Sequence, residues 1–167
     1  MPSNSLSHPA FEAFFDGLYG KNAHISPMNA LDGLTTDTVS FSASNAPYTI
    51  WEIIGHIIFW QDWFEHLLKT GERRPVPHAE DGWPYEGGPK TQESLEAACT
   101  RLIKYTQDME VQLLSPDMDL TQPKGDYATG FHVVQAAANH MSYHLGQIML
   151  LRRMEGNYPP PSGGETW

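Results

Sequence analysis

Residues 49–71 read TIWEIIGHIIFWQDWFEHLLKTG, and this stretch decides the fold of the chain. Thr49 and Glu52 have the spacing of a capping box, in which each side chain bonds the other residue's backbone N–H at the start of a helix. Gly71 is the residue type that commonly follows a helix end. Between them, apolar residues cover more than one stripe of a helical surface. The stretch therefore predicts a central helix from about residue 50 to about residue 69.

Apolar residues at helical spacing predict three further long helices. Working outward from the central helix, these cover residues 8–22, 91–114 and 129–155. Together the four segments predict an all-α fold, a four-helix bundle. Its long connections allow a crossover topology rather than a simple up-and-down order.

The connections between these helices differ in composition. Ser26 followed by Pro27 is typical of a helix start, so we expect a short helix over residues 28–34. Ser, Thr and Asn dominate residues 35–47, and prolines and glycines are dense in residues 71–90. Both stretches are therefore predicted to be loops.

Chain length and net charge limit the classes of protein to which this sequence can belong. A chain of 167 residues fits a single domain, which we assign to residues 1–167. Twenty acidic residues against ten basic ones give a formal charge of −10, which disfavours nucleic acid and anionic membranes as partners. The single cysteine, Cys99, excludes an intrachain disulfide and a cysteine-rich zinc site.

The sequence also bears on where the protein resides. The first residues lack the basic and apolar regions of a signal peptide. The longest apolar segment is interrupted by Glu52, His56 and Asp62, which argues against a membrane span. We expect a soluble, cytoplasmic protein.

Two histidines interrupt the inward face of the last helix. His140 and His144 occupy positions where Ala137 and Ile148 on either side indicate core. Residues four apart on a helix lie about 40° apart in projection, so both imidazoles can converge on one point. His56, in the most apolar segment of the chain, can supply a third imidazole from a facing helix. Three imidazoles are a common catalytic ligand set for zinc-like ions and leave a fourth position open.

The spacing alone leaves two interpretations open. A buried histidine is more often a hydrogen-bonded core residue than a ligand. Three together favour a cation, because one ion would satisfy all of them. The remaining histidines are weaker candidates; they are His8, His24, His66, His78 and His132.

Two motifs resemble the DinB/YfiT-like superfamily. They are WEIIGH at residues 51–56 and NHMSYHLGQI at residues 139–148, and the likeness extends over most of the chain. The resemblance implies a helical bundle of unusual connectivity that is often a homodimer. It also implies that His56, His140 and His144 bind a divalent metal ion, with zinc or nickel favoured.

The resemblance also suggests a reaction. Several relatives use low-molecular-weight thiols, mycothiol or bacillithiol, which implies a metal-dependent, small-thiol-dependent S-transferase acting on electrophilic small molecules. One alternative is a metal-dependent hydrolase of a small substrate, although Met141 stands where helical zinc proteases carry glutamate. Another is a non-catalytic, metal- or ligand-binding stress-response protein. The sequence does not assign a catalytic residue.

Three residues near the histidines are candidates for an outer shell or a pocket wall. Glu52, one turn before His56, could orient its ring or serve only in the capping box. Gln147, one turn after His144, could line the site or brace the helix. Trp60 could form a pocket wall, although aromatic residues at helical spacing more often belong to the core. A tail folded over the site would place Trp167 as a lid.

Overall fold

The fold is known from a computed structural model that describes residues 9–21, 23–44, 46–115 and 117–164. Within these residues the regular elements are all helices, so the predicted all-α class is confirmed. The α-helices are α1 (Pro9–Tyr19), α2 (Pro27–Leu31), α3 (Thr36–Ser40), α4 (Ile50–Thr70), α5 (Gln92–Leu113) and α6 (Gly130–Glu155), and one 3₁₀ helix, η1, covers Ala79–Gly82. Trp167 and His8 lie outside the described residues.

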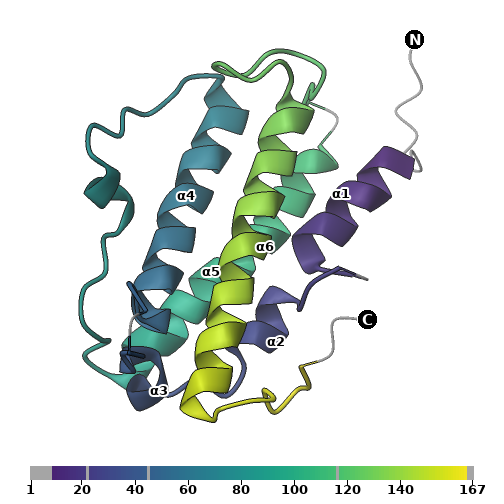
Figure 1. The fold of residues 1–167 in the computed structure, drawn as a ribbon. Coiled ribbons are helices and arrows are strands. Elements are labelled where there is room, and N and C mark those ends of the chain that lie inside the picture. The colour runs from purple at the N-terminus through teal and green to yellow at the C-terminus, as the bar shows by residue number, and fades with distance from the viewer. Residues whose placement is uncertain (1–8, 22, 45, 116, 165–167) are drawn as a thin grey trace.

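The long helices pack around α4. α4 contacts both α5 and α6. α1 also packs against both α6 and α5. The chain runs upward in α4 and α5 and downward in α6 and α1 in Figure 1. Since α4 and α5 run in the same direction, the chain between them must travel back along the 21 residues of α4, about 30 Å. We call this connection, residues 71–91, the return segment; it is the long crossover connection.

The ends of α4 follow the predicted pattern closely. The backbone N–H of Glu52 donates to the Thr49 hydroxyl at 3.2 Å, and the Glu52 carboxylate accepts from the Thr49 N–H at 2.7 Å. At the other end Gly71 takes a left-handed conformation with φ of 75°, where a side chain would be strained. α5 and α6 also begin and end within one residue of their predicted limits.

Two predictions in the connections were wrong. Residues 35–47 were expected to be loop, but α3 forms within them because Thr35 and Thr38 make a reciprocal capping box and Val39 is fully buried. Residues 71–90 were expected to be loop throughout, but η1 forms there, where the Asp81 carboxylate accepts from the backbone N–H of His78.

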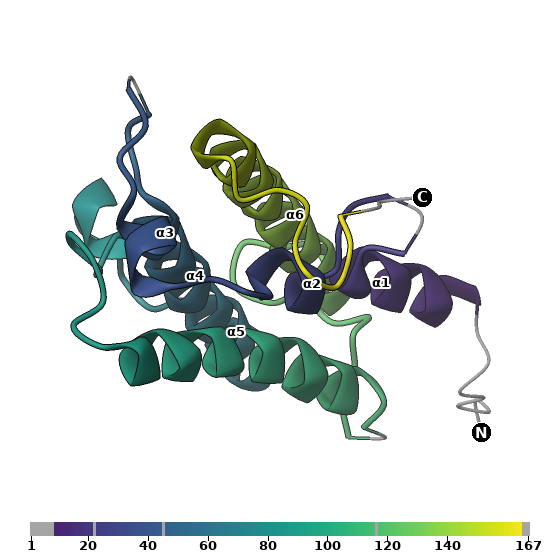
Figure 2. The same ribbon diagram turned by 90° about the horizontal axis from the view of Figure 1, so that it is seen from below.

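The end of α6 is fastened by a buried cation. Arg152 is fully buried and donates to the carbonyl oxygens of Ala30, Asp32 and Asn157 at 2.8–3.0 Å. These contacts hold the C-terminal segment across α2, as Figure 2 shows from below. Among the described residues, no helix is long and apolar enough to cross a lipid bilayer.

Candidate metal centre

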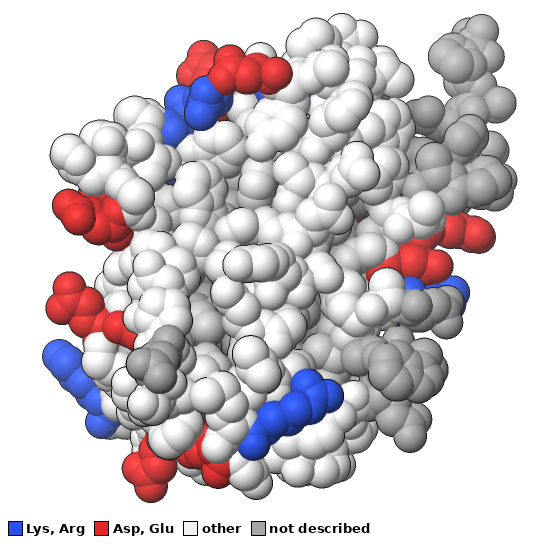
Figure 3. All heavy atoms as spheres, in the orientation of Figure 1, with Lys and Arg blue, Asp and Glu red and all other residues white. Residues whose placement is uncertain are grey.

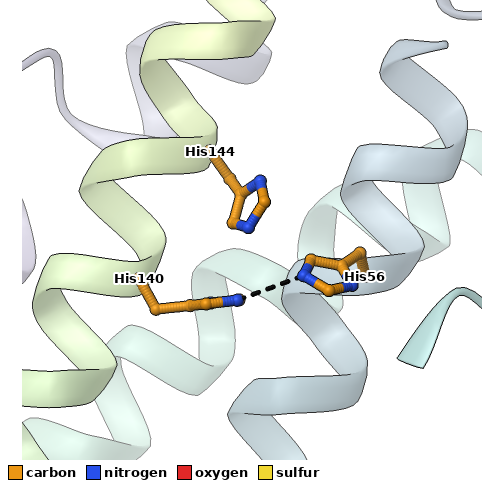
Figure 4. A group of neighbouring side chains, drawn as sticks. All are labelled: His56, His140 and His144. Atoms are coloured by element: carbon orange, nitrogen blue, oxygen red, sulfur yellow. Dashed lines mark hydrogen bonds between the residues drawn. The ribbon is translucent and has the colours of Figure 1, made fainter. Parts of the chain in front are cut away.

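The three predicted histidines come together between α4 and α6. One ring nitrogen from each of His56, His140 and His144 lies within 4.8 Å of the others. Figure 4 shows the two rings of α6 and the single ring of α4 pointing toward a shared space. His56 and His144 are buried, and His140 is half-buried.

The hydrogen bonds fix which nitrogen faces that space. The Nδ1 of His56 lies 2.7 Å from the carbonyl oxygen of Gly82, and a carbonyl can only accept, so Nδ1 carries the proton. The Nδ1 of His144 likewise lies 2.7 Å from Oε1 of Gln147. In both rings the proton on Nδ1 leaves the lone pair on Nε2. Metal-ligating histidines typically make this outer contact, which sets the tautomer and the ring orientation.

The separation of the donor atoms fits a shared ion. The Nε2 atoms of His56 and His140 lie 3.2 Å apart. Two nitrogens bound to one zinc at 2.0–2.1 Å with a tetrahedral angle are separated by about 3.3 Å. The residues present therefore fit a divalent metal, and His56, His140 and His144 would hold it.

Burial keeps the three imidazoles uncharged. It is the main cause that lowers the pKa of His56 to about 4 and of His140 to about 3, and the neighbouring histidine rings add to both shifts. Burial also lowers the pKa of His144, against the opposing effect of the hydrogen bond that its Nδ1 donates to Gln147. Neutral imidazole is the form that binds metal, so at pH 7 the ligands need lose no proton.

The return segment supplies the contacts that hold His56. Besides the Gly82 carbonyl, the Trp83 ring stacks on the His56 ring with centroids 3.8 Å apart. Tyr48 in turn stacks on the outer side of Trp83 at 3.6 Å. The sequence did not predict that Gly82 bonds His56 or that Trp83 stacks on it. The only sequence feature that could have indicated these contacts was an aromatic residue directly after a glycine in a proline-rich loop.

The outer residues proposed from the sequence have different positions. Gln147 contacts His144 directly, which agrees with the interpretation that it lines the site. The Trp60 ring lies 6.3 Å from the ring of His56 and 6.0 Å from that of His140, so it borders the site. Glu52 accepts from Thr49 in the capping box, and the Nδ1 of His56 faces Gly82 instead.

Three other described histidines make local contacts elsewhere. His24 bonds the carbonyl oxygens of Gly17 and Ile25, and His132 bonds the hydroxyl of Thr129. His66 lies one turn from Thr70, with which it shares a 3.4 Å contact. The face over α4 and α6 is largely free of charged side chains, which gather near its edges in Figure 3.

A comparison with known protein families identifies the family of this chain. The profile of the DinB superfamily matches residues 28–148, a span that includes all three histidines. The fold and the site define an all-α protein with three histidines clustered between two helices, and the chain belongs to the DinB superfamily. No curated protein and no solved structure gives a significant match.

Proposed function

We propose that this protein is a metal-dependent enzyme that transfers a small thiol onto electrophilic small molecules. The observation that carries the proposal is the make-up of the histidine cluster. Among the described residues it contains three imidazoles and no carboxylate or cysteine as a further donor. Structural zinc sites usually have four protein ligands, whereas catalytic sites keep one position for water or substrate.

The roles of the residues follow from their contacts. A bound divalent ion would lower the pKa of a substrate thiol so that thiolate exists at neutral pH. His56 and His144 keep their Nε2 atoms directed inward through Gly82 and Gln147. The rings of Trp60 and Phe64, each next to His140, limit the access of water to that side. The thiol proton passes to water, the thiolate sulfur bonds to the electrophilic carbon, and the leaving group departs with the electron pair of the broken bond.

A groove beside the cluster supports a thiol substrate that carries carboxylates. It measures about 510 Å³ and is lined by Trp60 and Trp63 together with Arg73, Arg74 and His78. Trp60 is shared between this groove and the border of the histidine cluster. Two guanidinium groups suit a carboxylate, although Arg73 also pairs with Asp126.

The alternatives have less support. A hydrolase needs a general base for water, but the candidate ligand group among the described residues holds no carboxylate, and Glu52 is engaged in the capping box. A storage or sensing protein would be favoured by a fourth protein ligand. Cys99 instead lines a separate groove with Leu31 and Leu95.

Metal analysis followed by a thiol panel tests the proposal. We expect about one divalent ion per chain and metal-dependent conjugation of 1-chloro-2,4-dinitrobenzene, with faster rates for carboxylate-bearing thiols than for 2-mercaptoethanol. Conjugation that persists at the same rate after complete chelation would contradict it. Ester or amide hydrolysis without thiol transfer would favour the hydrolase.

Assembly as a homodimer and a cytoplasmic location are also proposed. Both come from the family likeness and the character of the sequence. Light scattering coupled to size-exclusion chromatography tests the first, with a mass near 37 kDa expected for two chains of 18.7 kDa. A mass of one chain at micromolar concentration would exclude a stable dimer.

A further inference from the structure

A second groove lies along the C-terminal half of α6, where Gln147, which contacts His144 of the cluster, forms part of its wall. It measures about 310 Å³ and is bounded by Tyr48 and Ile53 on one side and by Gln147, Leu150 and Met154 on the other. Of the described residues that line it, none carries a formal charge. Its size falls at the small end of the range of ligand pockets.

Exposed apolar side chains gather in this groove. Leu150 is 57% exposed, Met154 is 51% exposed and Tyr48 is 37% exposed. Large apolar side chains grouped in a concave surface mark a binding site more often than single exposed ones do. Their burial against a ligand would stabilise the complex by about 25 cal/mol for each Å² removed from water.

The groove is connected to two of the three histidines. Gln147 lines it and also accepts from the Nδ1 of His144. Tyr48 lines it and stacks on Trp83, which stacks on His56. Among the described residues, the amide nitrogen of Gln147 has no hydrogen-bond partner, so it can donate to a ligand while Oε1 holds the histidine.

We propose that this groove binds a small, neutral, apolar molecule that carries a hydrogen-bond acceptor for Gln147. The described lining residues offer no charge for ionic recognition, and the polar amide within an apolar wall sets the orientation of the ligand. The ligand would be the electrophile of the transfer reaction, and this last assignment rests on the proposed function. Gln147 is then a positioning residue for His144 and a specificity residue for the electrophile.

Binding of 1,3-dinitrobenzene tests the groove without any reaction. This neutral nitroaromatic quenches tryptophan fluorescence, and it is titrated into metal-free and metal-loaded protein beside the anionic 3,5-dinitrobenzoate. We expect the neutral probe to bind both forms, and the anion at least fivefold more weakly. The groove lined by Arg73 and Arg74 can also hold a carboxylate, so anion binding is compared in the wild type and in the wall variants described next. Binding of the anion that equals or exceeds that of the neutral probe and is weakened by the wall variants would overturn the proposal.

Variants of the wall locate the probe. Leu150→Gln combined with Met154→Gln changes only exposed side chains, and we expect at least a fivefold loss of dinitrobenzene binding. Val111→Gln is the matched control, because Val111 is 68% exposed on α5 and does not line the groove. An equal loss of dinitrobenzene binding in the double variant and in Val111→Gln would overturn the proposal. So would a change in oligomeric mass with unchanged probe binding, because the face would then be an interface with a second copy.

Two variants separate the roles of Gln147. Gln147→Glu keeps an oxygen acceptor for His144 but loses the amide donor, so we expect metal affinity within about threefold of wild type and weaker probe binding. Gln147→Met loses both groups, and metal affinity should fall by about tenfold or more. Unchanged probe binding in both variants would overturn the role of the amide.

The groove and the proposed function can fail separately. If the wall variants lose dinitrobenzene but the wild type transfers no thiol to 1-chloro-2,4-dinitrobenzene, the groove stands and the transferase is wrong. If transfer proceeds and the wall variants leave its KM for the electrophile unchanged, the transferase stands and the groove assignment is wrong.

Discussion

The candidate metal centre has a helical side and an irregular side, and the two sides contribute different features. On the helical side, α4 and α6 provide every donor nitrogen, at positions fixed by helix periodicity. On the other side, the return segment gives the cluster no ligand, but its Gly82 and Trp83 set the tautomer and tilt of His56. The orientation of His56 therefore depends on a part of the chain that gives no ligand, whereas that of His144 is set by Gln147 on its own helix.

Removing a donor from the helical side should have the largest effect. His140→Ala leaves two ligands, and we expect metal affinity to fall by more than about a hundredfold. In wild type, metal at about a hundred times its Kd stabilises the fold by about 2.7 kcal/mol, which raises Tm by about 5–10 °C. The variant should lose this rise in a thermal scan with and without zinc.

His132→Ala is the control for that experiment. His132 is on the same helix, is exposed and bonds Thr129, so metal content and the thermal shift should stay as in wild type. If His140→Ala kept one ion per chain by elemental analysis, the helical side would not be the source of the ligands.

Disturbing the irregular side should have a smaller effect on the metal. Trp83→Ala removes the ring stacked on His56, and we expect about a tenfold loss of metal affinity in a competition titration, because the imidazole is held less firmly. Trp83→Phe keeps an aromatic face and should bind metal nearly as well as wild type. A loss as severe as that of His140→Ala would erase the distinction between the two sides.

The contact between the two sides can be broken from within α4. A methyl group at Gly55 would overlap the ring of Tyr85, which stacks on Trp51. Gly55→Ala should therefore destabilise the fold by about 1–2 kcal/mol in urea denaturation, although alanine normally gains about 1 kcal/mol over glycine in a helix.

Two further variants test whether the overlap with Tyr85 causes the loss of stability. Gly146→Ala, in α6 with open space around the added methyl, should stabilise the fold by about 0.5–1 kcal/mol. Adding Tyr85→Ala to Gly55→Ala should remove the penalty due to overlap, although the double variant also loses the stack on Trp51. If Gly55→Ala were as stabilising as Gly146→Ala, the return segment would not be packed against α4 as described.

The smallest effect is expected at the single cysteine. Burial, with a smaller contribution from Glu96, raises the pKa of Cys99 to about 11, so at pH 8 it should react with iodoacetamide about two hundredfold more slowly than a free thiol. Its rate should increase about tenfold for each pH unit until the pH approaches that pKa. Cys99→Ser should leave metal content and thiol transfer unchanged. Loss of either would mean that a thiol of the protein takes part.

The sequence predicted the helices and the donor atoms for a common reason. Thr49, Glu52 and Gly71 act locally, through capping bonds and a left-handed φ, so the limits of α4 could be read directly. His140 and His144 stood out because they interrupt an apolar stripe of the same helix. The short helix α3 was missed because its capping pair, Thr35 and Thr38, lies in a polar stretch typical of loops.

Other features depend on residues far apart in sequence. Glu52 and Gln147 each had two readings, and only the packed structure shows which partner each one meets. Arg152, in the last turn of α6, is fully buried among carbonyl oxygens of Ala30, Asp32 and Asn157. No local pattern distinguishes these outcomes.

By itself, the sequence determined the all-α class, the limits of α4, α5 and α6, and the identity of the three histidines that meet, whereas the helix predicted over residues 8–22 ends earlier, at Tyr19. Periodicity and capping are short-range properties, so they can be read from neighbouring residues. The tertiary structure decided that α4 and α5 run in the same direction, and this direction sends the return segment past His56. The bond to Gly82 spans 26 positions, and only the packing of the whole chain brings its two ends together.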